Sequence, residues 1–201
     1  MLKVENIQIK GFHTCKLDGG LDYVRQHAPF RSTESGAKPL RWQWLSTGYY
    51  FWTDSTFFAH KWGNQSYNGH YAILECDIRI CGQRLLDLVG NTGQQMLFSE
   101  LMRLYQSKLE RASEGRKSNP TVSTIIQHYR EQALNNDGIF PFDAIKAQDT
   151  AYKAEGSFED KEIKFTPVSR EKMFLVTRQQ LCLFEHAAGN IVDKDIVHPV
   201  A

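Results

Sequence analysis

Apolar and polar positions alternate in several stretches of the chain, as they do in strands with one buried face. The stretches "VENIQIKGFHTC" (4–15) and "YAILECDIRIC" (71–81) predict two strands, of which the second is the clearer. The segment "LRWQWLSTGYYFWT" (40–53) is rich in strand-favouring residues and is broken at Ser46-Thr47-Gly48, which predicts two short strands around a turn. Further strands are predicted at "IFPFDAIKA", "EIKFTPV" and "KMFLVTRQQLCLF".

Helical spacing of apolar residues marks other segments. "GLDYVRQHA" predicts a short helix, and "STFFAHKW" predicts one that Asp54 or Ser55 caps and Gly63 ends. Two longer helices are predicted at "QQMLFSELMRLYQSKLERA" and "TVSTIIQHYREQAL", the second capped by Thr121 or Ser118. Strands on both sides of a helical middle indicate an α+β fold with a mostly antiparallel sheet. We expect one domain over 1–201, with a helical insertion at about 93–135.

Composition adds few constraints. The 201 residues are 41% hydrophobic and 23% charged, with a net charge of +1, so no charge excess favours nucleic acid or an anionic membrane as a partner. No apolar run is long enough to cross a membrane, and the first residues lack the apolar core of a signal peptide. The four cysteines are widely spaced, which is typical of reduced, buried cysteines in a cytoplasmic protein.

The segment "STGYYFWTDSTFFAHKWG" (46–63) concentrates aromatic residues. Tyr49 and Tyr50 must point to opposite faces of a strand, so one of them can face a cleft beside Gly48 that has room for a flat ligand. Most of the other aromatic side chains are expected to pack in the core: Trp52, Phe57, Phe58 and Trp62.

Two other constellations are weaker. A zinc site could be assembled from His60, His70, Cys76 and Cys81, but their spacing matches no standard arrangement, so we expect no metal. Cys15 shares a strand face with His13 and could be a nucleophile, although no acid that would orient the histidine is identifiable.

Several pieces gain meaning from their order along the chain. His13 lies near the end of the first strand, Gly48-Tyr49-Tyr50-Phe51 opens a second, an Ala59-containing helix and "YAILECDI" follow, and Glu171 precedes a late apolar strand. This order, across about 7–90 and 139–184, resembles the ADP-ribosyltransferase superfamily. The resemblance is to its His-Tyr-Glu branch, the diphtheria-toxin and PARP-like side, and to bacterial toxin or effector members. It implies a split antiparallel β-sheet core.

The resemblance implies roles for individual residues. His13 would hydrogen-bond a ribose hydroxyl of NAD, and Tyr50 would stack on the nicotinamide with Ala59 leaving space beneath it. Glu171 would bond the ribose 2′-hydroxyl and stabilise the oxocarbenium-like transition state. Two further residues would belong to the cofactor site: Gly48 at its rim, and Thr14, which stands where many members have glycine.

The register that places Glu171 at the acidic position of the resemblance is uncertain by one residue. Lys172 falls on it in the neighbouring register, and Gln179 or Gln180 could supply a substitute polar contact without charge.

The resemblance therefore implies NAD-dependent mono-ADP-ribosyl transfer to a protein or nucleic acid, in a toxin or phage-defence effector that an antitoxin could neutralise. Three alternatives stay open. The chain could be an NAD glycohydrolase, or a catalytically inactive module that binds a nucleotide or base. It could also be an interaction protein whose 93–135 helices dock a partner.

Overall fold

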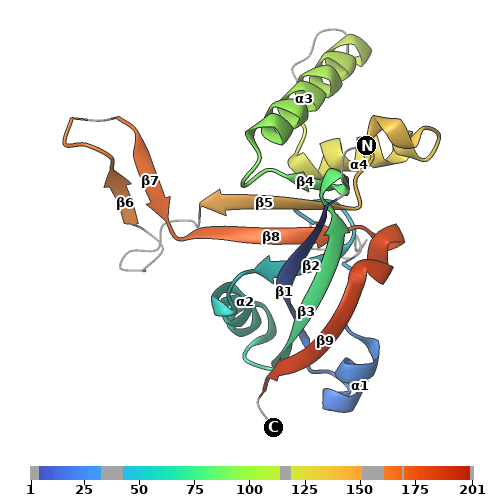
Figure 1. The fold of residues 1–201 in the computed structure, drawn as a ribbon, viewed down its shortest axis with the longest axis vertical. Coiled ribbons are helices and arrows are strands. Elements are labelled where there is room, and N and C mark those ends of the chain that lie inside the picture. The colour runs from blue at the N-terminus through green and yellow to red at the C-terminus, as the bar shows by residue number, and fades with distance from the viewer. Residues whose placement is uncertain (1–4, 33–42, 114–118, 151–160, 169, 200–201) are drawn as a thin grey trace.

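The computed structural model of the chain describes residues 5–32, 43–113, 119–150, 161–168 and 170–199. Seven strands form one sheet in the order β4-β5-β8-β2-β1-β3-β9, and all neighbours in it are antiparallel except β4 and β5 (Figure 1). Its strands are β1 (Asn6–Lys16), β2 (Tyr49–Thr53), β3 (Tyr71–Cys81), β4 (Leu85–Asp87), β5 (Ala144–Thr150), β8 (Thr177–Leu183) and β9 (Ile191–His198).

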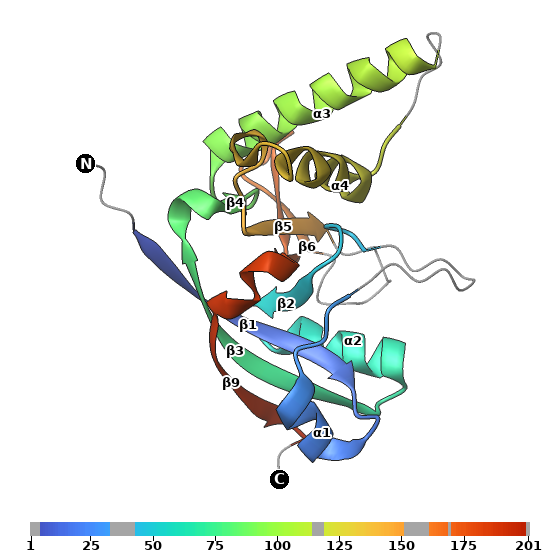
Figure 2. The ribbon, with the colours of Figure 1, turned by 90° about the vertical axis from the view of Figure 1, so that its right-hand side faces the viewer.

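The helices lie at the two ends of this sheet. Helices α3 (Thr92–Ala112) and α4 (Val122–Ala133) lie together beside β4 and β5, whereas α1 (Gly20–His27) and α2 (Phe57–Tyr67) lie at the β1–β3 end (Figures 1 and 2). Short 3-10 helices follow β3, α4 and β8, at Gly82–Arg84, Asp137–Ile139 and Glu185–Asn190. Strands on both sides of a helical pair confirm the predicted α+β class with a mostly antiparallel sheet. No helix in the described ranges has the length and apolar character needed to span a membrane.

The predicted strand at 71–81 is confirmed at its predicted bounds, because β3 pairs along most of its length with β1 on one side and with β9 on the other. Its side chains at Ile73, Leu74, Ile78 and Ile80 are buried. The predicted helices in the middle of the chain are likewise present, and Thr121 caps α4 by accepting a hydrogen bond from the Thr124 amide. Ser118, the alternative cap, lies outside the described residues.

The prediction of two strands within 40–53 is wrong in its first half. Only Tyr49–Thr53 forms a strand. Residues 44–47 form a turn and a bend, and Gly48 makes an isolated bridge with Ser32; residues 40–42 lie outside the described part. The physical reason is that hydrogen bonds from outside a sheet ladder hold the turn: Tyr50 bonds the backbone of Leu45 and Ser46, and Arg130 bonds Ser46 and Thr47.

Gly63 does not end the second helix as predicted. Helix α2 runs through Gly63 to Tyr67, and Asn68 follows it in the left-handed conformation with φ of 52°. A Cβ at position 63 would lie 2.4 Å from the ring of Tyr71, so glycine is needed here for packing rather than for termination. At the other end, Thr56 is the cap residue, and the Ser55 hydroxyl accepts a hydrogen bond from the Phe57 amide.

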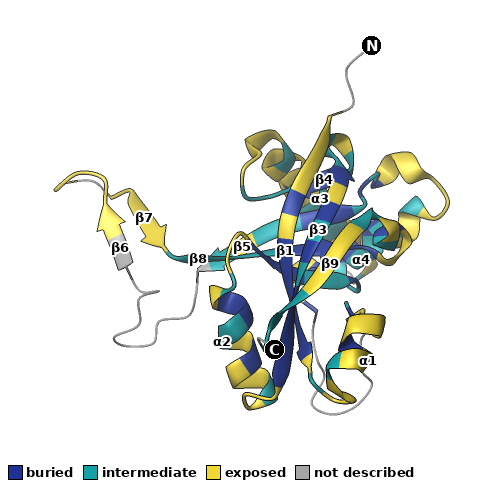
Figure 3. Cartoon of the chain, turned by 60° about the horizontal axis from the view of Figure 1, so that its bottom comes forward, coloured by how far each residue is buried: buried dark blue, intermediate teal, exposed yellow. Residues whose placement is uncertain are grey.

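The late apolar stretch "KMFLVTRQQLCLF" contains two strands rather than one. Strand β7 (Lys172–Leu175) pairs with β6 (Lys161–Lys164) in a separate two-stranded sheet, which we call the β6–β7 hairpin, and β8 enters the main sheet. The hairpin projects from the body of the molecule, and its described residues are largely exposed (Figures 1 and 3).

Candidate ligand-binding site

The sheet divides where β1 and β2 separate. The two strands pair at only two positions, Gly11 with Thr53 and Phe12 with Trp52, whereas β1 stays paired with β3 as far as Lys16. Beyond Phe12, therefore, the last residues of β1 no longer pair with the first residues of β2. A cavity of about 730 Å³ opens beside this separation, and we call it the central pocket. Its walls come from β1, β2, β8, α2 and the segments 30–32 and 43–44.

His13 bridges the two separating strands. Its Nδ1 lies 2.9 Å from the Tyr50 carbonyl oxygen, and its Nε2 lies 3.1 Å from the Phe30 amide nitrogen. Because Nε2 accepts the amide hydrogen bond, Nδ1 carries the proton and donates it to Tyr50. The imidazole is buried, which lowers its pKa to about 4. His13 is therefore neutral, with both nitrogens already bonded to backbone.

Tyr50 also lines the central pocket, and its hydroxyl is committed to the backbone. The hydroxyl donates to the Ser46 carbonyl at 2.7 Å and accepts from the Leu45 amide at 2.8 Å. Burial is the main reason that the pKa of the phenol is raised. Tyr49 packs against the core cluster on the other side of the strand. Tyr50 is thus available to a ligand through its ring.

The three remaining residues of the expected cofactor site differ in position. Thr14 lines the pocket, and its hydroxyl donates to the Ala59 carbonyl at 3.1 Å, which ties β1 to α2. Ala59 is fully buried in the core cluster that contains Phe12, and it does not line the pocket. Gly48 lies outside the lining as well. A Cβ there would be 2.6 Å from the Cys182 sulfur and the Leu183 carbonyl oxygen, so glycine allows β8 to approach.

Glu171 is not brought to this pocket. It is exposed directly before β7, on the β6–β7 hairpin, where its carbonyl accepts from the Phe165 amide at 3.4 Å. Lys172, the alternative in the neighbouring register, is exposed on the same hairpin. Gln180 of β8 does line the central pocket. The structure therefore places an imidazole, a phenol ring and an amide together, with the carboxylate of Glu171 elsewhere.

Aromatic and cationic side chains make up much of the pocket wall. Two cations, Lys16 and Arg31, line it, and no Asp or Glu is found among its described lining residues. Six aromatic side chains line it: Phe30, Trp44, Tyr50, Trp52, Trp62 and Tyr67.

Sequence reasoning missed Phe30, Arg31, Trp44 and Tyr67, because their position depends on how the chain crosses the strand ends. It also expected Phe57 and Trp62 to be packed in the core, whereas they are 47% and 40% exposed. Trp52 and Phe58 are buried as expected.

The other candidate chemistries find little support in the geometry. Cys15 lines the pocket near His13, but burial raises the pKa of its thiol to about 11, which opposes formation of the nucleophilic thiolate. His60 Nδ1 is 3.0 Å from the Tyr71 hydroxyl, and Cys76 is buried in β3. Within the described ranges, no three His, Cys, Asp or Glu side chains gather as metal ligands would.

A flat, anionic molecule is the ligand that this wall suits best, since rings offer stacking surfaces and two cations offer positive charge: Arg31, and Lys16, whose amine also lies 3.8 Å from the exposed carboxylate of Asp18. Comparisons of the chain with models of protein families, with curated proteins and with solved structures found no match.

Proposed function

We propose that the central pocket binds NAD. One observation carries this proposal: where β1 and β2 separate, His13 and Tyr50 meet at a single cavity whose wall combines aromatic rings with Lys16 and Arg31. NAD has two planar rings, which aromatic side chains can stack on, and a pyrophosphate, which cations can neutralise. The cavity of about 730 Å³ is within the usual range for small-molecule sites.

The activity that we propose with it is ADP-ribosyl transfer to a macromolecular acceptor. In such a step the bond between nicotinamide and ribose C1′ breaks, its electron pair leaves with nicotinamide, and the acceptor forms a new bond to C1′ while losing a proton. The resemblance of the sequence order to ADP-ribosyltransferases supports this proposal, as does the division of an antiparallel sheet at the pocket. In this chain, Gln180 is the polar side chain that β8 contributes at the pocket.

The second candidate is a module that binds NAD or a related nucleotide without turning it over. The observation that favours it is the chemistry of the described pocket wall, which offers the amide of Gln180 and no carboxylate. An amide can hydrogen-bond a ribose hydroxyl, but it supplies no negative charge to a developing oxocarbenium ion.

The binding proposal is tested by calorimetry with NAD. Trp62→Ala removes an exposed aromatic wall residue and should weaken binding about tenfold, the usual value of one stacking contact. Phe57→Ala is the matched control, because Phe57 is similarly exposed on the same helix and does not line the pocket. An unmodified chain that shows no heat of NAD binding contradicts the proposal.

Nicotinamide release, measured with candidate protein and nucleic acid acceptors, separates the two candidates. Transfer predicts release by the unmodified chain and its loss in Gln180→Ala. If the unmodified chain binds NAD without releasing nicotinamide, and only the Gln180→Glu variant releases it, the protein is the binding module. Loss of release in Glu171→Gln, with NAD binding retained, would assign the catalytic acid to the β6–β7 hairpin.

The biological role that goes with transfer is that of a toxin or defence effector. Expression should then slow growth of a bacterial host, and Trp62→Ala should relieve the defect while Phe57→Ala should not. Equal harm from both variants contradicts this role.

A further inference from the structure

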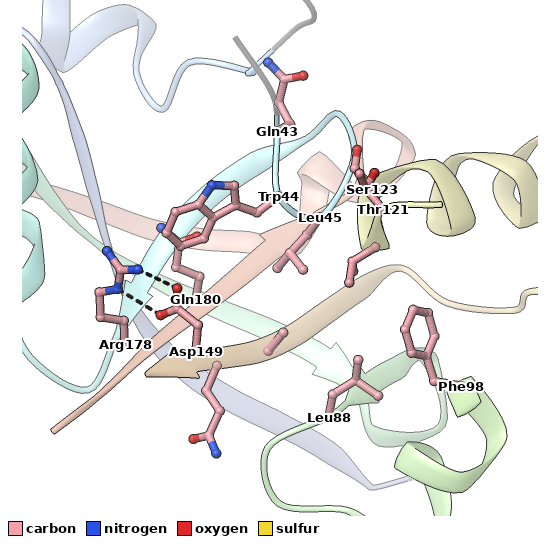
Figure 4. Close-up of a pocket in the computed structure, with 13 residues that line it drawn as sticks. Gln43, Trp44, Leu45, Leu88, Phe98, Thr121, Ser123, Asp149, Arg178 and Gln180 are labelled. Atoms are coloured by element: carbon pink, nitrogen blue, oxygen red, sulfur yellow. Dashed lines mark hydrogen bonds and ion pairs between the residues drawn. The ribbon is translucent and has the colours of Figure 1, made fainter. Parts of the chain in front are cut away.

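A second cavity adjoins the central pocket. It has a volume of about 460 Å³, and we call it the apolar pocket. Its floor is formed by β5 and β8, and the remaining walls come from the start of α4, Phe98 of α3, Leu88 and the segment 43–45 (Figure 4). The two cavities share Gln43, Trp44 and Gln180 as lining residues. The two cavities are therefore adjacent, with Trp44 and Gln180 in the wall of both.

The charges in the apolar pocket cancel each other. Its only charged lining residues in the described ranges are Arg178 and Asp149, which form a two-pronged ion pair with N–O distances of 2.8 and 2.5 Å. The guanidinium carbon of Arg178 also lies 4.9 Å from the centre of the Trp44 ring. A charged side chain entering this cavity would find no free counter-ion, and burying it unpaired would be costly. The occupant should be uncharged.

Among the polar lining side chains, those of Ser123 and Gln180 remain available to such an occupant. Ser123 is 7% exposed, and neither its hydroxyl nor the amide of Gln180 has a hydrogen-bond partner among the described residues. Both groups can donate and accept. Figure 4 shows Gln180 beside Trp44 and the ion pair, with Leu88 and Phe98 on the apolar side of the cavity. The indole ring of Trp44 and the apolar wall suit a flat ring, and the Ser123 hydroxyl and the Gln180 amide can both donate to and accept from its polar edges. Such an occupant is a flat, uncharged heterocycle.

We infer that the apolar pocket binds a nucleobase, and that this base is the acceptor of ADP-ribose from NAD in the central pocket. The second part rests on the proposed function, whereas the first does not. In the transfer, a nitrogen of the base forms the bond to ribose C1′ as nicotinamide leaves with its electron pair, and the proton displaced from the base passes to solvent. The shared lining residues Trp44 and Gln180 make the two cavities adjacent, as transfer from one ligand to the other requires.

The binding part is tested with the four DNA nucleosides and a short single-stranded oligonucleotide, by calorimetry or NMR titration. Ala147 on β5 lines the cavity, so Ala147→Phe should fill it and weaken nucleoside binding at least about tenfold, as loss of one stacked base does. Affinity for NAD should stay unchanged. Ala112→Phe, at the exposed end of α3, is the control for the same change elsewhere. If Ala147→Phe fails to fold, Val122→Trp blocks the cavity from its half-exposed rim.

Three results would overturn the inference. The first is that no nucleoside binds, and the second is that nucleosides bind equally well to Ala147→Phe. The third is that the acetylated amides of lysine, arginine and glutamate bind instead of nucleosides and that Ala147→Phe abolishes their binding.

The transfer part is tested by mass spectrometry of the oligonucleotide after incubation with NAD and the protein. The oligonucleotide should gain one ADP-ribose with the unmodified chain and none with Ala147→Phe. Nucleoside binding without any NAD binding would contradict the proposed function and leave the base site standing. NAD turnover with an unmodified oligonucleotide would contradict the base as acceptor.

Discussion

His13 shows how one side chain can replace part of a sheet ladder. Where β1 and β2 cease to pair, its imidazole links the Tyr50 carbonyl to the Phe30 amide and packs near the rings of Phe30 and Phe51. No titrating group contacts the ring in these interactions, so burial governs its pKa. The imidazole thus links the two strands beside the central pocket and forms part of its wall.

The depressed pKa of His13 makes stability depend on pH. Its pKa is 6.5 when unfolded and about 4 when folded, so between these values the unfolded state binds more protons, and stability falls as pH falls through this window. The loss from pH 7 to pH 5 should be about 2 kcal/mol. Urea unfolding at both pH values measures it, and His13→Gln should remove this contribution. An equal pH dependence in the variant contradicts the assignment.

Gly48 is fixed by what lies against it. Gly48→Ala places a methyl group 2.6 Å from both Cys182 sulfur and Leu183 carbonyl oxygen, so β2 and β8 must move apart, at a cost of about 2 kcal/mol. Thermal unfolding measures this loss. Gly189→Ala is the control, since a Cβ there meets nothing within 4 Å and should leave stability nearly unchanged.

At the scale of elements, Arg130 connects α4 to the turn before β2. Its Nη1 bonds the Ser46 hydroxyl at 2.9 Å and the Thr47 carbonyl at 2.8 Å, and its Nη2 lies 2.5 Å from Glu185. The guanidinium carbon is 4.2 Å from the centre of the Phe184 ring. The helical pair thereby holds the turn from which Tyr50 enters the pocket wall.

Removing this connection should be costly. Arg130→Met leaves the Thr47 carbonyl and Glu185 without the guanidinium and should lower the free energy of unfolding by about 3 kcal/mol in chemical denaturation. It should also weaken NAD binding, because the Tyr50 wall loosens. Arg103→Met removes only an exposed pair with Glu100 within α3, so it should change little. Similar losses from both variants would rule out the special role of Arg130.

Sequence patterns predict well the elements in which burial of one face alone determines the order of apolar and polar residues. Strand β3 buries its apolar side chains from Tyr71 to Ile80 and leaves only Arg79 exposed, and the apolar faces of α3 and α4 repeat at helical spacing. Strand β9 was not predicted, because "IVDKDIVH" carries charges at its centre and is recognisable as a strand only by its pairing with β3. The prediction that Gly63 ends its helix is wrong because the contact that requires glycine there is with the ring of Tyr71, which belongs to β3.

At the scale of the molecule, the site follows from how distant segments converge. The order of motifs indicated His13 and Tyr50, but no local pattern shows that β1 and β2 separate after two pairs, which is what creates the pocket. Arg31 and Trp44 lie in non-repetitive segments whose course the sequence does not specify. Gln180 was noted only as a substitute for an acid, since its strand was expected to begin earlier, at the residues that form β7.

The β6–β7 hairpin should be the least stable part of the described structure. An isolated two-stranded sheet is marginal in water, and this one exposes apolar side chains, with Phe165 67% and Val168 92% exposed. Hydrogen exchange followed by mass spectrometry should find its amides exchanging far faster than those of β1 and β3. Equal protection of the two sheets contradicts this expectation.

Strand β9 forms one end of the main sheet, and its middle residues are Asp193, Lys194 and Asp195. If the β9 strands of two copies paired antiparallel about Lys194, each Asp193 would face the other copy's Asp195, and like charges opposite one another repel. Replacing both aspartates by valine should therefore let copies assemble edge to edge, visible as larger species in size-exclusion chromatography. An unchanged elution profile would contradict a role for this repulsion.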